Sequence, residues 1–272
     1  MERTPLTIAP EKVVVELQAL LGDHDPNKVV MAFDGDGTLW SGDVGEDLFR
    51  AAMRERYLLE DARAALLAEA ERYQIPLGAS TDANSVAGVL MAAYLAGKYP
   101  ERETCAMMTW CYAGRTVAEV EQLARDVLEE EDLESRLTPE LEPIVDFARS
   151  AGVRLVLVSA SPRAIVEAAG SFWDFGPADI AAATPAVAEG RLLPRLDGAV
   201  PYAEAKLSAG RALFGGARWL AAFGDNVFDI DMLTTAEMGV AVRPKPRLAS
   251  ELAALGLRLL EAGPLVSRPT AR

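Results

Sequence analysis

Histidine and cysteine are scarce in this sequence. Among 272 residues there are one histidine, His24, and two cysteines, Cys105 and Cys111. The histidine lies in a polar turn and the cysteines have no histidine nearby, which disfavours Ser–His or Cys–His catalysis, a disulfide and a zinc site. The acids and bases of any catalytic site in this chain must therefore be carboxylates.

Basic residues and long apolar runs are also few. The chain has 27 Lys and Arg residues against 41 Asp and Glu residues, a formal net charge of −14. This charge argues against a nucleic-acid or anionic-membrane partner. It allows a phosphorylated substrate, because a metal ion, one lysine and helix N-termini can bind a small anion. No apolar run approaches the roughly 18 residues of a membrane span, and the first residues contain no signal-peptide segment. We expect a cytoplasmic protein and leave its oligomeric state open.

Two carboxylates follow directly after a short apolar run. Val29 to Phe33 has the length and β-branched content of a buried strand, and Asp34, Asp36 and Thr38 come next. Residues two apart on a strand point the same way, so both carboxylates are expected to face one point past its end. In open α/β sheets the carboxyl ends of strands bind ligands. The alternative is a plain turn rich in Asp and Gly.

Three further signals make the plain turn the weaker interpretation. In chain order they are Ser159 after the apolar run Val153 to Val158, Lys206, and Asp225 with Asp229 after the run Trp219 to Phe223. This ordered set resembles the haloacid dehalogenase-like hydrolase superfamily. A helical insertion after the first motif, together with VLVSASP, is most similar to the phosphoserine phosphatase-like branch with a type-one helical cap.

The fold expected from these patterns is α/β. Apolar strands separated by helices predict a doubly wound parallel sheet, the Rossmann-like core of this superfamily, formed by residues 1–42 and 137–272. Residues 43–136 show helical patterns without a convincing strand and are expected to form an inserted all-helical cap domain, called the cap below. The strand Val29 to Phe33 should be central, and a last strand is expected near Met238 to Val242.

The resemblance implies a role for each acidic residue. Asp34 corresponds to the nucleophile that forms an aspartyl-phosphate, and Asp36 to the general acid and base. Asp34, Asp36, Asp225 and Asp229 would form the metal site, Asp36 through its main-chain carbonyl. Asp225 is expected to be a direct ligand, whereas Asp229 would act through a water molecule or orient Lys206. All-oxygen ligands suit a hard cation such as Mg²⁺.

The phosphate-binding residues follow from the same motifs. Ser159 is expected to donate to a phosphate oxygen, with the amide of Ala160 beside it at a helix start. Lys206 is the lysine that the family pattern requires between the serine and the acidic motif. Thr38 and Asn226, which lie within the first and last motifs, are further expected substrate-binding residues.

The cap should choose the substrate. Phosphoserine phosphatases have a glutamate shortly after the first motif, a role that Asp43 or Glu46 could take here. They also have a cap arginine for the substrate carboxylate, but the segment Thr104 to Gly114 has none. Trp110 and its apolar neighbours in that segment either line an apolar pocket wall or pack inside the cap.

The resulting functional prediction is a Mg²⁺-dependent phosphatase that acts on a small phosphorylated metabolite. The carboxylate of Asp36 favours phosphoryl transfer over dehalogenation, because a halide leaving group needs no proton. The alternative is a phosphotransferase or phosphomutase, in which an alcohol replaces water as the acceptor of the phosphoryl group.

Overall fold

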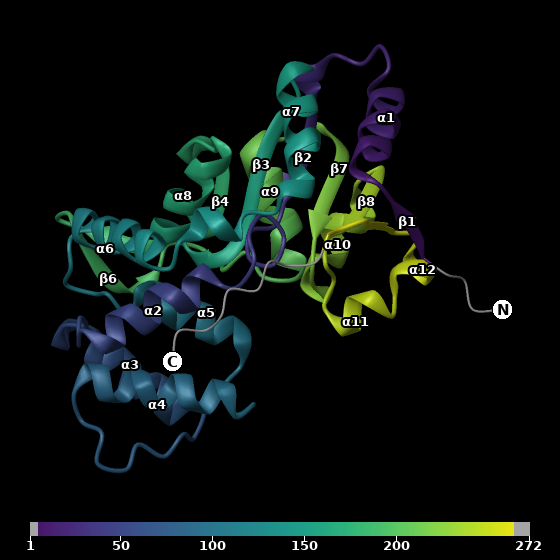
Figure 1. Cartoon of the computed structure of the whole chain (residues 1–272). Helices are drawn as coiled ribbons and strands as arrows, with labels where there is room; N and C mark the ends of the chain where they lie inside the picture. The colour runs from purple at the N-terminus through teal and green to yellow at the C-terminus, as the bar shows by residue number, and fades with distance from the viewer. Residues whose placement is uncertain (1–4, 264–272) are drawn as a thin grey trace.

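The computed structural model describes residues 5–263, and its core is a seven-stranded parallel sheet in the order β1–β9–β8–β7–β2–β3–β4 (Figure 1). The strands of this sheet are β1 (Leu6–Ile8), β2 (Val29–Phe33), β3 (Arg154–Pro162), β4 (Ile180–Ala183), β7 (Arg218–Gly224), β8 (Met238–Ala241) and β9 (Arg258–Leu260). A separate antiparallel hairpin consists of β5 (Pro185–Ala188) and β6 (Arg191–Leu196).

Helices pack on both faces of the sheet because the central strand is apolar throughout. In β2, Met31 and Phe33 join one buried cluster, while Val30 and Ala32 join a second cluster on the other face. The first cluster also contains residues of α1 (Pro10–Leu21), α7 (Glu142–Ser150) and α8 (Arg163–Gly170). The second contains residues of α9 (Glu204–Phe214), α10 (Ile230–Thr235), α11 (Pro246–Ala249) and α12 (Leu252–Leu255). The predicted doubly wound sheet is confirmed.

The order of the strands brings the expected site residues to one edge. β2 lies between β7 and β3, with Phe33 in register with Phe223 on one side and Leu157 on the other. Parallel strands in register end at the same edge of a sheet, so the residues after these positions are neighbours. This confirms the central position that the sequence predicted for β2.

Two short strands at one end of the sheet were not predicted. β1 and β9 have three residues each and pair with one another in parallel. Each has only one buried residue, so neither segment shows the alternation of apolar and polar residues that predicts a strand. The expectation that the strand near Met238 is the last is therefore wrong. Two short helices, α11 and α12, lie between this strand and β9.

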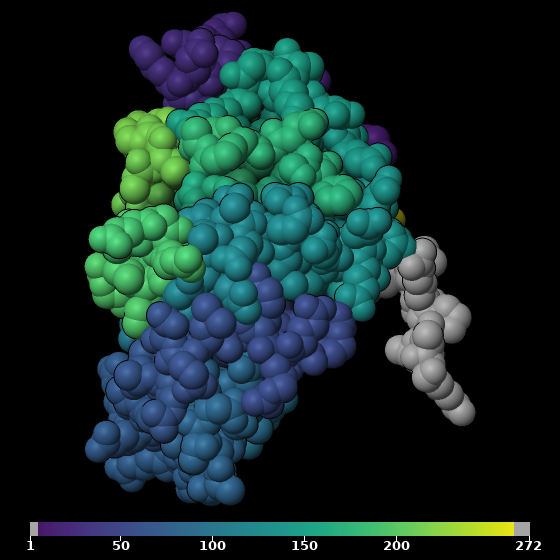
Figure 2. Space-filling model, turned by 90° about the vertical axis from the view of Figure 1, so that its left-hand side faces the viewer, coloured from purple at the N-terminus to yellow at the C-terminus, as the bar shows by residue number. Residues whose placement is uncertain are grey.

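The chain between β2 and α7 is helical, as the sequence indicated. Its helices are α2 (Val44–Arg54), α3 (Arg63–Arg72), α4 (Ala83–Leu95), α5 (Glu101–Trp110) and α6 (Val117–Glu130). A capping box begins α6: Thr116 accepts from the N–H of Glu119, whose side chain accepts from Thr116. Helices α2 to α5 form a lobe below the sheet, the blue part of Figure 2.

The β5–β6 hairpin of the core also contacts the cap. The N–H of Gly114 donates to the carbonyl of Leu192 at 2.9 Å, and the N–H of Leu192 donates to the carbonyl of Arg115 at 2.8 Å. Arg191 adds a 2.6 Å hydrogen bond to the carbonyl of Gly114. The cap is thus attached to the core at a place far from its two covalent connections.

Across residues 5–263 no helix has the length and apolar character needed to cross a membrane.

Candidate active site

Asp34 lies directly after the central strand and is only 5 % exposed. Its N–H donates to the carbonyl of Phe223 at 2.9 Å, which continues the pairing between β2 and β7 beyond Phe33. Burial raises the pKa of the Asp34 carboxyl well above its usual range, and the nearby charge of Asp229 raises it further. A nearby cation would stabilise the carboxylate form.

Asp34, Asp225 and Asp229 form a compact buried group. One carboxylate oxygen from each lies within 4.8 Å of the others. Lys206 bridges two members of the group, with Nζ 2.5 Å from Oδ1 of Asp34 and 2.6 Å from Oδ1 of Asp229. Desolvation lowers the pKa of Lys206, but the two carboxylates outweigh it and raise this pKa above its usual value. Lys206 therefore supplies one permanent positive charge against three acidic groups.

Asp229 organises the loop that carries Asp225. Its Oδ2 accepts from the N–H groups of Asp225 at 3.1 Å and Asn226 at 2.9 Å, while its Oδ1 accepts from Lys206. A Cβ at Gly224 would lie 2.6 Å from the Cβ of Asp229, so only glycine allows this close turn. Of the two roles expected for Asp229, contact with Lys206 is the one present here.

Asp225 is the member of this group that Lys206 does not contact. Burial raises its pKa to about 6, partly offset by the ammonium of Lys245. Gly37, with φ of +83°, brings the main chain close to it, because a Cβ there would lie 2.3 Å from Oδ2 of Asp225. The three buried carboxylates offer only hard oxygen ligands, and this donor set fits Mg²⁺.

Asp36 lies in a turn rather than on the strand, because the extended chain ends at Phe33 and turns at Gly35 and Gly37. Its carboxylate nevertheless lines the same small cavity as Asp34. Its Oδ1 accepts from Trp40 Nε1 and from the N–H of Val44, each at 2.8 Å. Its Oδ2 accepts from Ser161 Oγ at 2.6 Å. Three donors hold this carboxylate at the rim of the acidic group.

A cavity of about 60 Å³ brings the expected core residues together. Its lining includes Asp34, Asp36, Asp43, Ser159, Ala160, Lys206, Asp225 and Asn226. Ser159 is buried, and its Oγ accepts from the N–H of Ser161 at 3.1 Å, in the last part of β3, where the pairing with β4 shifts register between Val158 and Pro162. Thr38 is fully buried and does not line this cavity; its Oγ1 has no hydrogen-bond partner in the described part of the chain.

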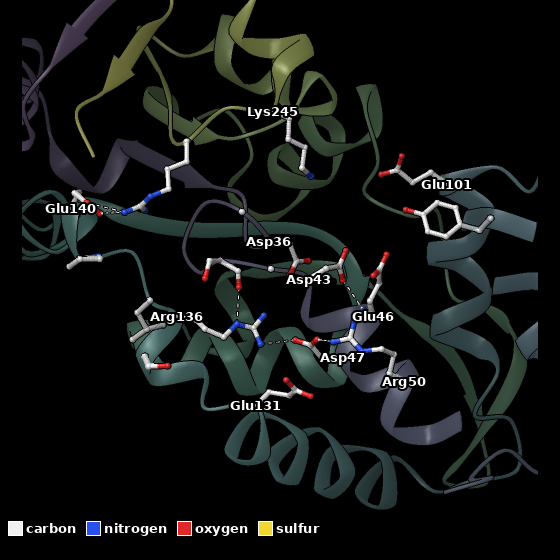
Figure 3. Close-up of a pocket in the computed structure, with 18 residues that line it drawn as sticks. Asp36, Asp43, Glu46, Asp47, Arg50, Glu101, Glu131, Arg136, Glu140 and Lys245 are labelled. Carbon is white, nitrogen blue, oxygen red and sulfur yellow. Dashed lines mark hydrogen bonds and ion pairs between the residues drawn. The ribbon is translucent and has the colours of Figure 1, made fainter. Parts of the chain in front are cut away.

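The small cavity opens into a larger one of about 870 Å³ beneath the cap (Figure 3). The two share Asp36, Asp43, Glu101 and Lys245, and Glu46 lines the larger one. Asp43 is the N-cap of α2 and accepts from the N–H of Glu46 at 2.8 Å. Burial and the charge of Asp36 raise the pKa of Asp43 to about 8.

Arginines are present in the larger cavity, but they are paired. Arg136 contacts Asp47 at 2.7 Å and Arg243 contacts Glu140 at 2.8 Å. Arg50 is exposed and also contacts Asp47. No arginine lines the smaller cavity within residues 5–263. Next to the acidic group there is thus no arginine for a bidentate contact with a substrate carboxylate.

Trp110 lies in the packed interior of the cap. It is buried together with Met107, Met108 and Tyr112 in the large apolar cluster. It lines neither of the two cavities as far as the described residues go. The structure therefore favours the packing alternative over the pocket wall for Trp110. Tyr94, Cys105 and Tyr202 occupy the wall instead, Cys105 and Tyr202 in the smaller cavity and Tyr94 in the larger.

Sequence reasoning missed several residues of the site. Trp40 binds the carboxylate of Asp36, and Glu101, Tyr202 and Lys245 line the small cavity. Of these residues, only Lys245 could have been predicted from the sequence. It is a charged residue between two prolines shortly after a parallel strand, and such positions lie at the ligand-binding edge of the sheet. The others come from segments whose approach to the site depends on the tertiary fold.

Comparison with known families agrees with this geometry. Residues 31–234 match the haloacid dehalogenase-like hydrolase family, a range that contains all four motifs. The chain belongs to the haloacid dehalogenase-like hydrolase family. The comparison with curated proteins found no match.

Solved structures share the fold at low sequence identity. A protein of unknown function from Bordetella pertussis Tohama I has 20 % identity and a TM-score of 0.63, covering 86 % of this chain and 98 % of its own. A probable phosphoserine phosphatase from Vibrio cholerae has 15 % identity and a TM-score of 0.51, covering 86 % and 68 %. Cytosolic 5'-nucleotidase IIIB bound to cytidine has 14 % identity and a TM-score of 0.53, covering 93 % and 85 %.

Proposed function

We propose that this protein is a Mg²⁺-dependent phosphatase that hydrolyses a small phosphomonoester through an aspartyl-phosphate on Asp34. The observation that carries the proposal is the convergence of Asp34, Asp225, Asp229 and Lys206, with Asp36 beside them in one small cavity. Membership of the hydrolase family supports it, and so does the likeness in fold to a probable phosphoserine phosphatase.

In the first half-reaction, an oxygen of Asp34 forms a bond to phosphorus as the bond from phosphorus to the ester oxygen breaks. Asp36 donates a proton to the leaving oxygen, so that the alcohol departs neutral. In the second half-reaction, Asp36 takes a proton from water, whose oxygen attacks phosphorus and releases Asp34 and inorganic phosphate. The hydrogen bonds from Trp40, Val44 and Ser161 hold Asp36 in place for both proton transfers.

Asp34 and Asp225 would hold the cation, with the main-chain carbonyl of Asp36 as the further ligand that the family resemblance implies. When bound, Mg²⁺ neutralises charge on the transferring phosphoryl group and removes the repulsion between two anions. Lys206 holds Asp34 in position and adds a positive charge next to the nucleophile. The buried Ser159 hydroxyl and the main chain of Ala160 would contact the phosphate oxygens, and Asn226 is a further contact in the same cavity.

The substrate is proposed to be a small phosphorylated metabolite without a carboxylate. Next to the phosphate site the cavities are lined by Asp43, Glu46 and Glu101, and no arginine lines the smaller cavity within residues 5–263 to bind a carboxylate. Phosphoserine should therefore be a poorer substrate than a phosphorylated amino-alcohol. Arg50, the exposed arginine of the larger cavity, is the residue that would bind the carboxylate if phosphoserine were preferred.

Phosphate release with and without added alcohol acceptors tests the reaction type. A phosphatase releases inorganic phosphate stoichiometrically in both conditions, whereas a phosphotransferase, the alternative function, gives phosphorylated acceptor instead. Asp34→Asn should abolish turnover and the acid-stable phosphoenzyme while leaving the circular dichroism spectrum unchanged, because the amide has the same shape but is a poor nucleophile. Retained turnover in Asp34→Asn would exclude the proposed nucleophile. The cytoplasmic location expected from the sequence stays a prediction, which fractionation of the producing cells tests.

A further inference from the structure

Lys245 is a second lysine at the acidic group and has no role in the steps above. It follows β8 and is the N-cap residue of α11, between Pro244 and Pro246. Its N–H donates to the main-chain carbonyl of Asp225 at 2.8 Å, and its Nζ lies 3.3 Å from Oδ2 of the same residue. Both the main-chain N–H and the side-chain ammonium of Lys245 therefore contact Asp225.

The two lysines at this site differ in how firmly they are held. The side chain of Lys206 is 7 % exposed and contacts two carboxylates at 2.5 and 2.6 Å. The side chain of Lys245 is 56 % exposed, and the one ion pair recorded for it among residues 5–263 is the longer contact to Asp225. The ammonium of Lys245 lies largely in solvent, whereas the Asp225 carboxylate that it contacts is buried. Lys245 can therefore leave Asp225 at small cost once a cation takes its place beside this carboxylate, whereas Lys206 cannot leave its partners.

The charges at the site explain why a removable ammonium is useful. Three buried carboxylates lie within 4.8 Å of one another, and Lys206 neutralises at most one of them. Lys245 approaches the member that Lys206 does not touch, and the oxygen it contacts, Oδ2 of Asp225, is the one that lies against Gly37 of the first motif. A cation shared by Asp34 and Asp225 would compete with the ammonium for this carboxylate.

We propose that Lys245 is a displaceable internal counter-ion of Asp225, which neutralises this carboxylate in the metal-free protein and competes with the divalent cation for it. The inference rests on the proposed function, because it requires a cation at this carboxylate group. When the cation binds, the ammonium moves into the mouth where the two cavities meet, towards Glu101 on α5, which lies across from it in Figure 3. Lys245 is a positioning residue in this scheme and sets the affinity of the site for its metal.

Calorimetric titration of Mg²⁺ into the substrate-free protein tests the competition. Lys245→Gln should bind Mg²⁺ about tenfold more tightly than the wild type, within the usual range of coupling between two ligands of one site. Lys245→Met should behave in the same way, because it also removes the charge, and Lys245→Arg should restore an affinity close to that of the wild type. The rise in melting temperature on adding Mg²⁺ should be larger for Lys245→Gln than for the wild type.

The matched control is Lys12→Gln, an exposed lysine on α1 whose loss changes the net charge equally. If Lys245→Gln changes the Mg²⁺ affinity no more than Lys12→Gln does, or weakens it, the competition is excluded while the phosphatase proposal stands. A wild-type protein that does not bind Mg²⁺ at all would overturn both. A variant that bound more tightly while Lys245→Arg did so as well would also contradict the proposal, because the charge would then not be the cause.

Discussion

Arg136 ties the two chain connections between core and cap by donating from Nε to the carbonyl of Ser41 at 2.8 Å. In return, the N–H of Ser41 donates to the carbonyl of Arg136 at 2.9 Å. The guanidinium also contacts Asp47 on α2 at 2.7 Å, and Asp47 is only 4 % exposed (Figure 3). The two segments that connect core and cap, around Ser41 and Arg136, are therefore hydrogen-bonded to each other, and we call this connection the neck. The neck restrains the angle between the cap and the core.

Arg136→Ala should lower the free energy of unfolding by about 2–4 kcal/mol, because it leaves a buried carboxylate short of one partner. Urea denaturation followed by circular dichroism measures the change. Arg54→Ala is the matched control, since Arg54 and Glu130 form an exposed pair on the cap that is worth less than about 1 kcal/mol. Equal losses of unfolding free energy in the two variants would show that the contact between Arg136 and Asp47 stabilises the protein no more than an exposed ion pair does.

Asp36→Asn should slow turnover of an alkyl phosphate by about 10²- to 10⁴-fold, the usual contribution of a general acid. An activated aryl phosphate should be much less affected, because its leaving group departs without a proton. The ratio of kcat values for the two substrates is the measurement. Asp34→Asn serves as the control, since it should abolish turnover of both, and equal losses in Asp36→Asn would show that Asp36 is not the proton donor.

Removal of the metal should stop the reaction. Turnover should vanish in chelator and return with added Mg²⁺, and Asp225→Asn should weaken Mg²⁺ binding by about 10- to 100-fold. Calorimetric titration measures the affinity directly. Asp231→Asn on α10 is the control, because Asp231 is exposed and should leave both metal affinity and turnover unchanged. Full turnover in chelator would show that the buried carboxylates do not hold a catalytic cation.

The raised pKa of Asp43 predicts a pH-dependent stability difference. The pKa is about 8 in the folded protein against an ordinary value of 3.8, so the folded state binds the proton more tightly than the unfolded state. The contribution of Asp43 to stability is complete below pH 3.8 and is lost as pH rises towards 8. Asn has no proton to lose and is an equally good N-cap, so it removes this dependence without removing the cap.

Asp43→Asn should therefore become steadily more stable than the wild type between pH 5 and 8, by at most about 1.4 kcal/mol per pH unit, and the difference should level off above pH 8. Urea denaturation in chelator at several pH values measures it. A difference that stays constant with pH would show that Asp43 is ionised throughout this range.

Trp110→Ala should act on stability rather than on substrate binding. Truncation of a buried tryptophan in a packed core costs about 3–5 kcal/mol, and the ring lies in the apolar interior of the cap. KM for the preferred substrate should stay within about twofold of the wild-type value at a temperature where the variant is folded. A large increase in KM without loss of stability would restore the pocket-wall interpretation.

The positions of the core motifs could be read from the sequence because each depends on local chemistry. The strand Val29–Phe33 was predicted with its exact bounds, since five apolar residues followed by carboxylates form a pattern that few other structures allow. Asp34 and Asp225 directly follow β2 and β7, and Ser159 lies near the end of β3, so their convergence follows from the side-by-side order of these parallel strands. β1 and β9 were not predicted because each has only three residues, of which one is buried, and so short a segment shows no apolar periodicity.

By itself, the sequence determined the parallel sheet, the helical insertion and the identity of the acidic residues, because apolar periodicity and motif spacing are local properties of the chain. The tertiary structure decided which way each side chain points and what surrounds it. It placed the carboxylate of Asp36 against Trp40 and Ser161, and buried Trp110 in the large apolar cluster. It also brought Lys245, 20 residues further along the chain, onto Asp225. Such contacts join segments that are distant in sequence, and only the packing of sheet, helices and cap together defines them.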